Sequence, residues 1–204
     1  KDRVAKHQEY TVRIPFSDFK VFDFICQNVP KNSQLQVSNS SAIRYLQLFD
    51  VDKSIQVFCN RGTSGIDGST STAIGAALAS NLPTILITGD ISFLYDSNAL
   101  WNNYIPKNFK IILLNNSGGG IFRILPGHQE TETFNRYFET SHQLNASHLA
   151  KMYGFDYFEA NDEATLQQQY KSFLNQNEKP SILEIFTPEK VNNGILLEFF
   201  RGLK

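Results

Sequence analysis

The stretch TILITGDISFLYDSNALWNNYIPKNFKIILLNN (84–116) decides the fold. An apolar, β-branched run at 84–88 and a second run at 109–114, apolar except for Lys110, enclose a segment of helical character over about 92–104. Short apolar runs without polar alternation are typical of parallel strands that are buried on both faces. The stretch therefore predicts a strand, a helix and a second strand that lies parallel to the first.

The rest of the chain continues this alternation. We expect strands at 35–37, 55–59, 155–159 and 181–187, and helices at 18–28, 40–49, 69–80, 146–153, 163–175 and the C-terminus. Such alternation predicts an α/β fold, with a doubly wound, mainly parallel sheet and helices on both faces. Residues 1–15 are expected to form a linker or entry segment, residues 16–204 are expected to form one domain, and no structure is predicted for the loop 118–143.

Composition narrows the class of protein. The 204 residues are 41% hydrophobic with a formal net charge of −1, which suits one domain with a sizeable core and argues against a nucleic-acid or membrane-surface partner. No apolar stretch is long enough for a transmembrane helix, and the polar start KDRVAKHQEY is no secretory signal. Because that start also lacks Met, we expect a fragment of a longer cytoplasmic protein. Cys26 and Cys59 are interpreted as structural thiols.

Polar residues close both strands of the deciding stretch. Asp90 and Asn116 lie 26 positions apart, the length of one strand–helix–strand unit, so both reach the same edge of the sheet. A carboxylate, an amide oxygen and a backbone carbonyl suit Mg²⁺ when phosphate oxygens and water complete its shell. The glycines 118–120 permit a close approach of backbone to ligand, and helix starts after Gly68 and Asp90 are expected to face an anion. Each feature alone fits an ordinary cap or turn, but together they predict a metal-bridged diphosphate site.

Three longer strings carry a resemblance to a known family. NRGTSGIDG (60–68), GDISFLYDSNAL (89–100) and NNSGGGIFRILPG (115–127) resemble the C-terminal domain of the menaquinone-biosynthesis 2-succinyl-5-enolpyruvyl-6-hydroxy-3-cyclohexene-1-carboxylate synthases, which are thiamine-diphosphate enzymes. The Gly-Asp and Asn-Asn pairs indicate only the cofactor, whereas the first string is specific to this family. The resemblance implies a thiamine-diphosphate-binding domain of the diphosphate (PP) type, with the pyrimidine and central domains absent from this chain.

The resemblance also implies roles for individual residues. Asp90, Asn116 and the carbonyl of Gly118 would hold Mg²⁺, with Mn²⁺ as an alternative. Ile66 would support the bent conformation of the cofactor, and the other residues implied to contact it are Ser64, Gly65, Gly89, Ile91, Ser92, Asn116, Gly118 and Ile121. The residues implied to meet the substrates are Asn39, Ser40, Arg44, Arg61 and Phe122.

The implied reaction is a transferase reaction. The family decarboxylates 2-oxoglutarate and adds the resulting succinyl carbanion equivalent to isochorismate; both substrates carry carboxylates, which suits bidentate arginines. The glutamate that activates the cofactor is expected on a pyrimidine domain of a partner subunit in a homo-oligomer. We therefore assign no catalytic acid or base to this chain and expect the chain alone to be inactive.

Three other functions stay open from the sequence. An acetolactate synthase or a 2-oxo-acid decarboxylase would share the Gly-Asp and Asn-Asn pairs but not the NRGTSGIDG string. A nicotinamide-dependent Rossmann oxidoreductase needs G-x-G-x-x-G, which the glycines 118–120 do not complete because Arg123 stands at the third position. A non-catalytic binding module would have no need of Asp90 and Asn116. Arg44 is also compatible with a solvated helix surface, and the histidines 128, 142 and 148 are interpreted as structural.

Overall fold

The computed structural model describes residues 2–125 and 127–202 and contains a six-stranded sheet in the order β2-β1-β3-β4-β6-β5. Every neighbouring pair is parallel. The strands are β1 (Gln34–Val37), β2 (Gln56–Cys59), β3 (Thr84–Gly89), β4 (Lys110–Asn115), β5 (Asp156–Ala160) and β6 (Ser181–Phe186). The expected α/β fold is confirmed, with a sheet that is wholly parallel.

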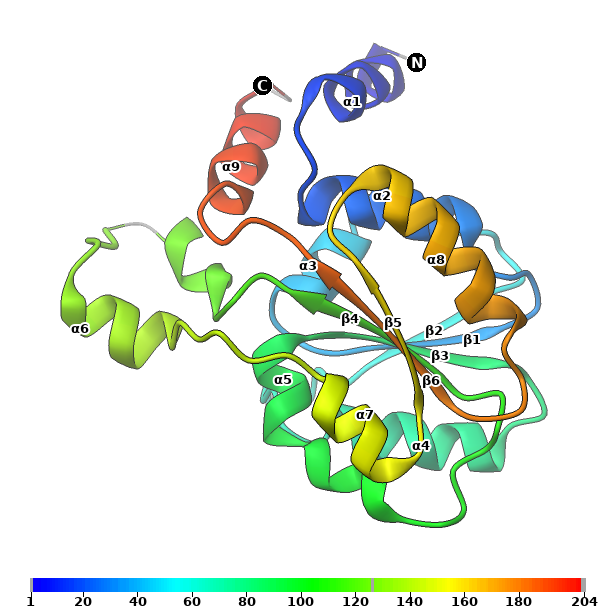
Figure 1. The fold of residues 1–204 in the computed structure, drawn as a ribbon. Helices are drawn as coiled ribbons and strands as arrows, with labels where there is room; N and C mark the ends of the chain where they lie inside the picture. The colour runs from blue at the N-terminus through cyan, green and yellow to red at the C-terminus, as the bar shows by residue number, and fades with distance from the viewer. Residues whose placement is uncertain (1, 126, 203–204) are drawn as a thin grey trace.

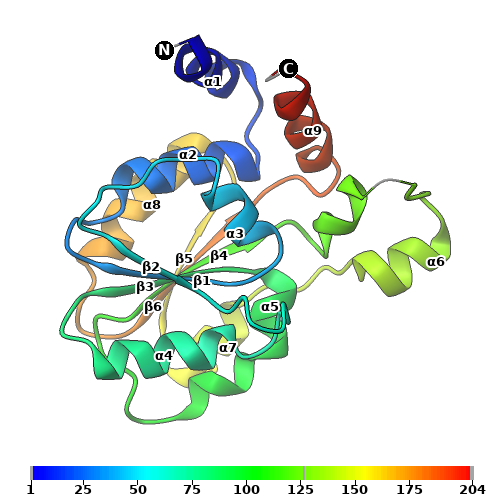
Figure 2. The same cartoon turned by 180° about the vertical axis from the view of Figure 1, so that it is seen from behind.

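Helices cover both faces of this sheet, as Figures 1 and 2 show from opposite sides. One face carries α2 (Asp18–Asn28), α3 (Ser41–Leu46) and α8 (Glu163–Asn175), and the other carries α4 (Ser69–Ala79), α5 (Asp90–Tyr95) and α7 (Ser147–Tyr153). Alternate residues of each strand enter the two layers, so that Ile85 and Ile87 join one core cluster and Leu86 joins the other. None of the helices within the described part of the chain is both long and apolar enough to cross a membrane.

The two ends of the chain pack against each other. Residues 1–15 were expected to be a linker or entry segment; the structure has a helix there, α1 (Asp2–Arg13), which lies beside α9 (Asn192–Gly202). The Tyr10 hydroxyl donates to the Ile195 carbonyl at 2.5 Å, and the ring of Tyr10 lies 5.7 Å from that of Phe199. This helix is stabilised by contacts distant in sequence, which local composition does not reveal.

The helix expected over 92–104 is interrupted. The structure has the short α5, then a 3₁₀ turn at η1 (Ser97–Trp101), with the buried Asp96 between them. The Asp96 carboxylate accepts hydrogen bonds from the backbone nitrogen and the hydroxyl of Ser71, at 2.7 and 2.6 Å. A carboxylate of the chain itself therefore accepts from one backbone nitrogen at the start of α4, and the binding of a ligand anion there stays a prediction.

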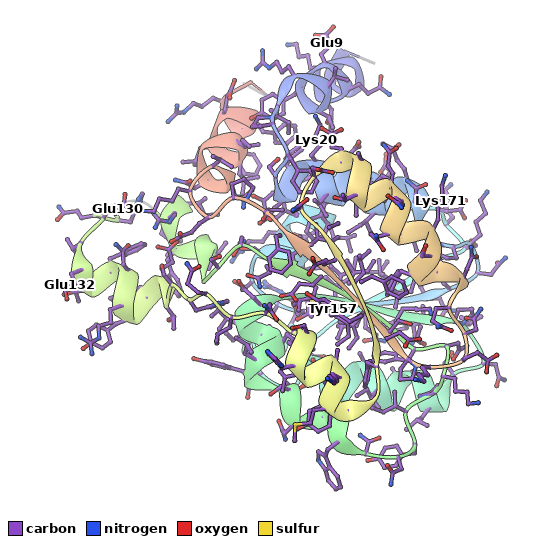
Figure 3. All side chains as sticks on the ribbon, viewed as in Figure 1. Glu9, Lys20, Glu130, Glu132, Tyr157 and Lys171 are labelled. Atoms are coloured by element: carbon purple, nitrogen blue, oxygen red, sulfur yellow. The ribbon has the colours of Figure 1, made fainter. Side chains whose placement is uncertain are left out.

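The loop 118–143 contains short helical turns and projects from the body of the domain (Figure 1). These turns are η2 (Gly120–Ile124), α6 (Glu132–Phe134) and a π-helical turn, η3 (Asn135–Glu139). Figure 3 shows Glu130 and Glu132 at the outer end of this loop. The buried side chains of Arg123 and Glu139 form a bidentate ion pair that fastens the two arms of the loop together.

Candidate functional site

The candidate site lies where the order of strands changes direction. From β1 the chain moves to β2 at one edge of the sheet and then returns to form β3 and β4 on the other side of β1. In open parallel sheets such a switch leaves a crevice beyond the carboxyl ends of the strands, where ligands bind. The loops that follow β1, β3 and β4 meet here, and these loops carry the predicted polar and glycine residues.

A cavity of about 250 Å³ occupies this crevice. Loops after four strands and the projecting segment contribute to its wall. The predicted site residues that line it are Asn39, Ser40, Ile66, Gly89, Asp90, Ile91, Ser92, Asn116, Gly118, Ile121 and Phe122. The structure thus brings together residues from widely separated parts of the sequence, as predicted for a site at the carboxyl edge of the sheet.

Asp90 links the loops after β3 and β4. Its carboxylate is 4% exposed; Oδ1 accepts from the backbone nitrogen of Ile91 at 2.7 Å, and Oδ2 accepts from that of Gly118 at 2.9 Å. Gly118 has a φ of +154°, and a Cβ added there would lie 2.8 Å from the backbone oxygen of Glu139. Only glycine fits this position without displacing backbone, so the loop can bring its peptide groups close to Asp90.

The two consecutive asparagines point to different places. Asn115 is buried and its amide nitrogen donates to Glu184 Oε1 at 2.7 Å, so it serves the interior of the fold. Asn116 lines the cavity, and its amide nitrogen donates to Asp18 Oδ2 at 2.9 Å. Its Oδ1 is buried without a hydrogen-bond partner in the described part of the chain. This oxygen is therefore available to a ligand, and a ligand would offset the cost of leaving a buried polar atom unpartnered.

These oxygens suit a hard cation. The described residues contain no group of three or more His, Cys, Asp or Glu side chains arranged to hold a metal ion, so a cation here needs other donors. The candidate donors at the cavity are the Asp90 carboxylate, the Asn116 amide oxygen and the backbone of Gly118. Mg²⁺ is commonly bound by few protein oxygens of this kind together with phosphate oxygens, so the residues present fit a magnesium diphosphate.

Two titratable side chains beside these donors were not predicted. Burial raises the pKa of Asp18 to about 6, against the opposing effect of hydrogen bonds from Thr187 and Asn116. His142 Nε2 lies 3.3 Å from Asp90 Oδ2, and this neighbouring carboxylate raises the pKa of His142. Neither residue belongs to a motif, and their places depend on contacts between distant segments; His142 had been interpreted as structural only.

The remaining predicted cofactor residues are held by the same loops. The Ser92 hydroxyl donates to the carbonyl of Ile66 at 2.5 Å, which connects the loop after β3 to the loop after β2. Ser64 and Gly65 do not line the cavity; Ser64 is exposed, and its carbonyl accepts from the Asn39 amide. Their contact with a cofactor stays a prediction.

The two predicted substrate arginines lie outside the cavity. Arg61 is exposed, and its Nη1 donates at 2.6 Å to Oδ1 of Asn39, a residue of the cavity wall. Arg44 is exposed on α3 and lines a small hollow that adjoins Asn116 and Gly120. Phe122, which does line the cavity, packs edge-on against Phe138 with ring centroids 6.0 Å apart. Their substrate roles stay predictions.

Comparison with known families identifies the class of this site. Residues 39–185 match the family described as "Thiamine pyrophosphate enzyme, C-terminal TPP binding domain". The solved structure of benzoylformate decarboxylase from Polynucleobacter necessarius is similar to this chain with a TM-score of 0.68 at 18% sequence identity, over 88% of this chain and 34% of that one. At this identity the likeness shows the fold, and it is the fold that the sequence predicted.

Curated relatives are far more similar in sequence. The 2-succinyl-5-enolpyruvyl-6-hydroxy-3-cyclohexene-1-carboxylate synthase of Flavobacterium psychrophilum is 68% identical over 203 residues, which is 100% of this chain and 37% of that protein. The synthase of the same name from Flavobacterium johnsoniae is 65% identical, over 98% of this chain and 36% of that protein. That of Bacteroides fragilis is 42% identical over 94% and 35%. The resemblance stated from the motifs is confirmed, and the chain spans a little over a third of the length of these relatives.

Proposed function

Because the chain belongs to the family of C-terminal thiamine pyrophosphate-binding domains of thiamine pyrophosphate enzymes, we propose that it holds the diphosphate of this cofactor through Mg²⁺ at the carboxyl ends of β3 and β4. One observation supports the proposed Mg²⁺ site. The Oδ1 atom of Asn116 is buried without a hydrogen-bond partner among the described residues, and Asn116 lines the same cavity as the buried Asp90.

The proposed roles of the residues follow from their places. Asp90 contributes the negative charge of the metal site, and Asn116 Oδ1 and the Gly118 carbonyl contribute neutral oxygens; Mn²⁺ suits the same donors. The side chains of Ile66, Ile91 and Ile121 give the cavity an apolar wall. When bound, thiamine diphosphate supplies the electron sink for removal of carbon dioxide from a 2-oxo acid. The protein supplies binding, orientation and exclusion of water.

For the whole protein we propose the activity that its relatives' names state. A transferase reaction of this kind decarboxylates 2-oxoglutarate and adds the succinyl unit to isochorismate. Support comes from the 68% identity with a synthase of that name and from the string NRGTSGIDG (60–68), which sets this family apart from other thiamine-diphosphate enzymes. We propose that a partner subunit completes each site, so that the working form is a homo-oligomer.

Arg61 is expected to recognise a substrate carboxylate. In the full-length protein, Arg61→Ala should lower kcat/KM for 2-oxoglutarate or isochorismate about 10- to 150-fold, which corresponds to about 1.5–3 kcal/mol for a lost charge-assisted hydrogen bond. Thiamine-diphosphate affinity should stay within about twofold, because Arg61 does not line the cavity beside Asp90.

Steady-state kinetics with each substrate varied in turn, and cofactor titration, measure this difference. Arg201→Ala is a matched control, since Arg201 is also an exposed arginine but lies in the last turn of α9. Wild-type kcat/KM for both substrates in Arg61→Ala would show that Arg61 has no part in recognition.

A further inference from the structure

Asp18 lies in a closed ring of hydrogen bonds behind the metal site. The residue is 2% exposed at the start of α2. Its backbone nitrogen donates to Asn192 Oδ1 at 2.8 Å, and its Oδ1 accepts from the Thr187 hydroxyl at 2.6 Å. Asn192 Nδ2 in turn lies 3.4 Å from Thr187 Oγ1, which closes the ring. The three residues come from α2, from α9 and from the end of β6.

The direction of each bond in this ring follows from the chemistry of its members. A backbone nitrogen only donates, so Asn192 must present its oxygen to Asp18 and its nitrogen to Thr187. The Thr187 hydroxyl therefore accepts from Asn192 and gives its proton to Asp18 Oδ1. Asp18 Oδ2 remains, and as a carboxylate oxygen it accepts.

Of the two ends of an amide side chain, only the NH₂ group can donate a hydrogen bond to Asp18 Oδ2. Asn116 presents its Nδ2 to this oxygen at 2.9 Å, across 98 positions of sequence. The opposite atom of the same amide, Oδ1, is then left without a partner among the described residues, and Asn116 is a residue of the cavity wall. Without Asp18, nothing in this contact distinguishes the two ends of the amide, which are nearly identical in shape.

We propose that Asp18 is a positioning residue that orients the side-chain amide of Asn116, so that its oxygen rather than its nitrogen faces the metal. This inference rests on the proposed metal site. An amide nitrogen turned toward the cation would offer hydrogens in place of a lone pair, so the site would lose one ligand. Asp18 itself does not line the cavity that Asp90 and Asn116 share, and it acts through Asn116 alone.

The test uses the full-length protein and the isosteric variant Asp18→Asn. Binding of thiamine diphosphate is followed by calorimetry at a series of Mg²⁺ concentrations, and the concentration that gives half of the maximal binding is determined. We expect this concentration to rise about 10- to 100-fold, the usual effect of removing a group that orients a metal ligand. At saturating Mg²⁺ the cofactor should still bind, and the circular dichroism spectrum should be unchanged. Asp18→Ala, which also removes the acceptor of Asn116 Nδ2, should shift the Mg²⁺ dependence in the same direction and serves if Asp18→Asn does not fold.

A second substitution separates orientation from general damage. The double variant combines Asp18→Asn with Asn116→Asp. Both terminal atoms of the side chain at position 116 are then oxygens, so either can accept from the amide at position 18 while the other faces the metal. The half-saturating Mg²⁺ concentration should therefore return to within about threefold of wild type. Glu184→Gln is the matched control, because Glu184 is a buried carboxylate that accepts from the neighbouring Asn115 at 2.7 Å. This control should leave the Mg²⁺ dependence unchanged.

The outcomes distinguish this inference from the proposed function. If wild-type protein binds thiamine diphosphate equally well with and without Mg²⁺, the metal site itself is wrong. If wild-type binding depends on Mg²⁺ but Asp18→Asn has the wild-type half-saturating concentration, only the role of Asp18 is overturned. An equal shift in Glu184→Gln, or no recovery in the double variant, would also overturn it.

Discussion

Asp90→Ala in the full-length protein is expected to weaken Mg²⁺-dependent binding of thiamine diphosphate at least about 100-fold and to abolish synthase turnover. The substitution removes the only formal negative charge proposed for the metal shell, and a divalent ion near diphosphate depends strongly on such a charge. It also removes the acceptor of the Gly118 backbone nitrogen, so the loop after β4 loses its link to β3. The measurement is calorimetric titration with cofactor at saturating Mg²⁺.

Asp162→Ala provides the control for this experiment. Asp162 also sits at the start of a helix, where its side chain accepts from the Thr165 backbone nitrogen at 2.7 Å, but it caps α8, outside the cavity wall. Its loss should lower the stability slightly, because α8 loses its N-cap, and leave cofactor affinity unchanged. If Asp90→Ala binds the cofactor as wild type does, the assignment of the metal site to Asp90 is wrong.

The 204-residue chain by itself is expected to fold but to have no synthase activity. Its sheet is covered by helices on both faces and encloses two clusters of buried residues, which is the arrangement of an independent domain. The activating glutamate is proposed to lie on a separate pyrimidine domain, and the chain spans 37% of the length of its Flavobacterium psychrophilum relative. Cofactor affinity should also fall, because this chain is proposed to contact only the diphosphate half of the cofactor.

Two measurements check this expectation. Circular dichroism and thermal unfolding report on the fold, and turnover is assayed with 2-oxoglutarate, isochorismate, thiamine diphosphate and Mg²⁺. The full-length protein, assayed at equal molar concentration, is the positive control. Turnover by the chain within tenfold of that control would show that the other domains are not needed, contrary to this account.

The strands that position the metal site were predictable because their signal is local. The apolar runs that became β3 and β4 ended at Gly89 and Asn115, one position beyond their predicted ends. The carboxyl ends of parallel strands meet at one edge of the sheet. The spacing of Asp90 and Asn116 was therefore sufficient to predict that both residues line one cavity. The family match then decides between this site and the Rossmann oxidoreductase that the sequence had left open.

Features that depend on distant contacts were not predictable in the same way. Asp18 reaches Asn116 across 98 positions, and no spacing rule relates a helix start to a strand end on another part of the chain. The helix α1 owes its place to contacts such as that of Tyr10 with Ile195, 185 positions away. The projecting loop 118–143 lacks an apolar period because much of it faces solvent, and the Arg123–Glu139 pair that closes it is ionic.

The central claim is that this chain binds the cofactor's diphosphate through a metal ion held by Asp90 and Asn116. Titration of the full-length protein with thiamine diphosphate, once with Mg²⁺ and once with a chelator in its place, tests it most directly. The account predicts at least about tenfold tighter binding with Mg²⁺, and no such gain when thiamine, which lacks the diphosphate, replaces the cofactor. Equal affinity for thiamine diphosphate with Mg²⁺ and with chelator would contradict it.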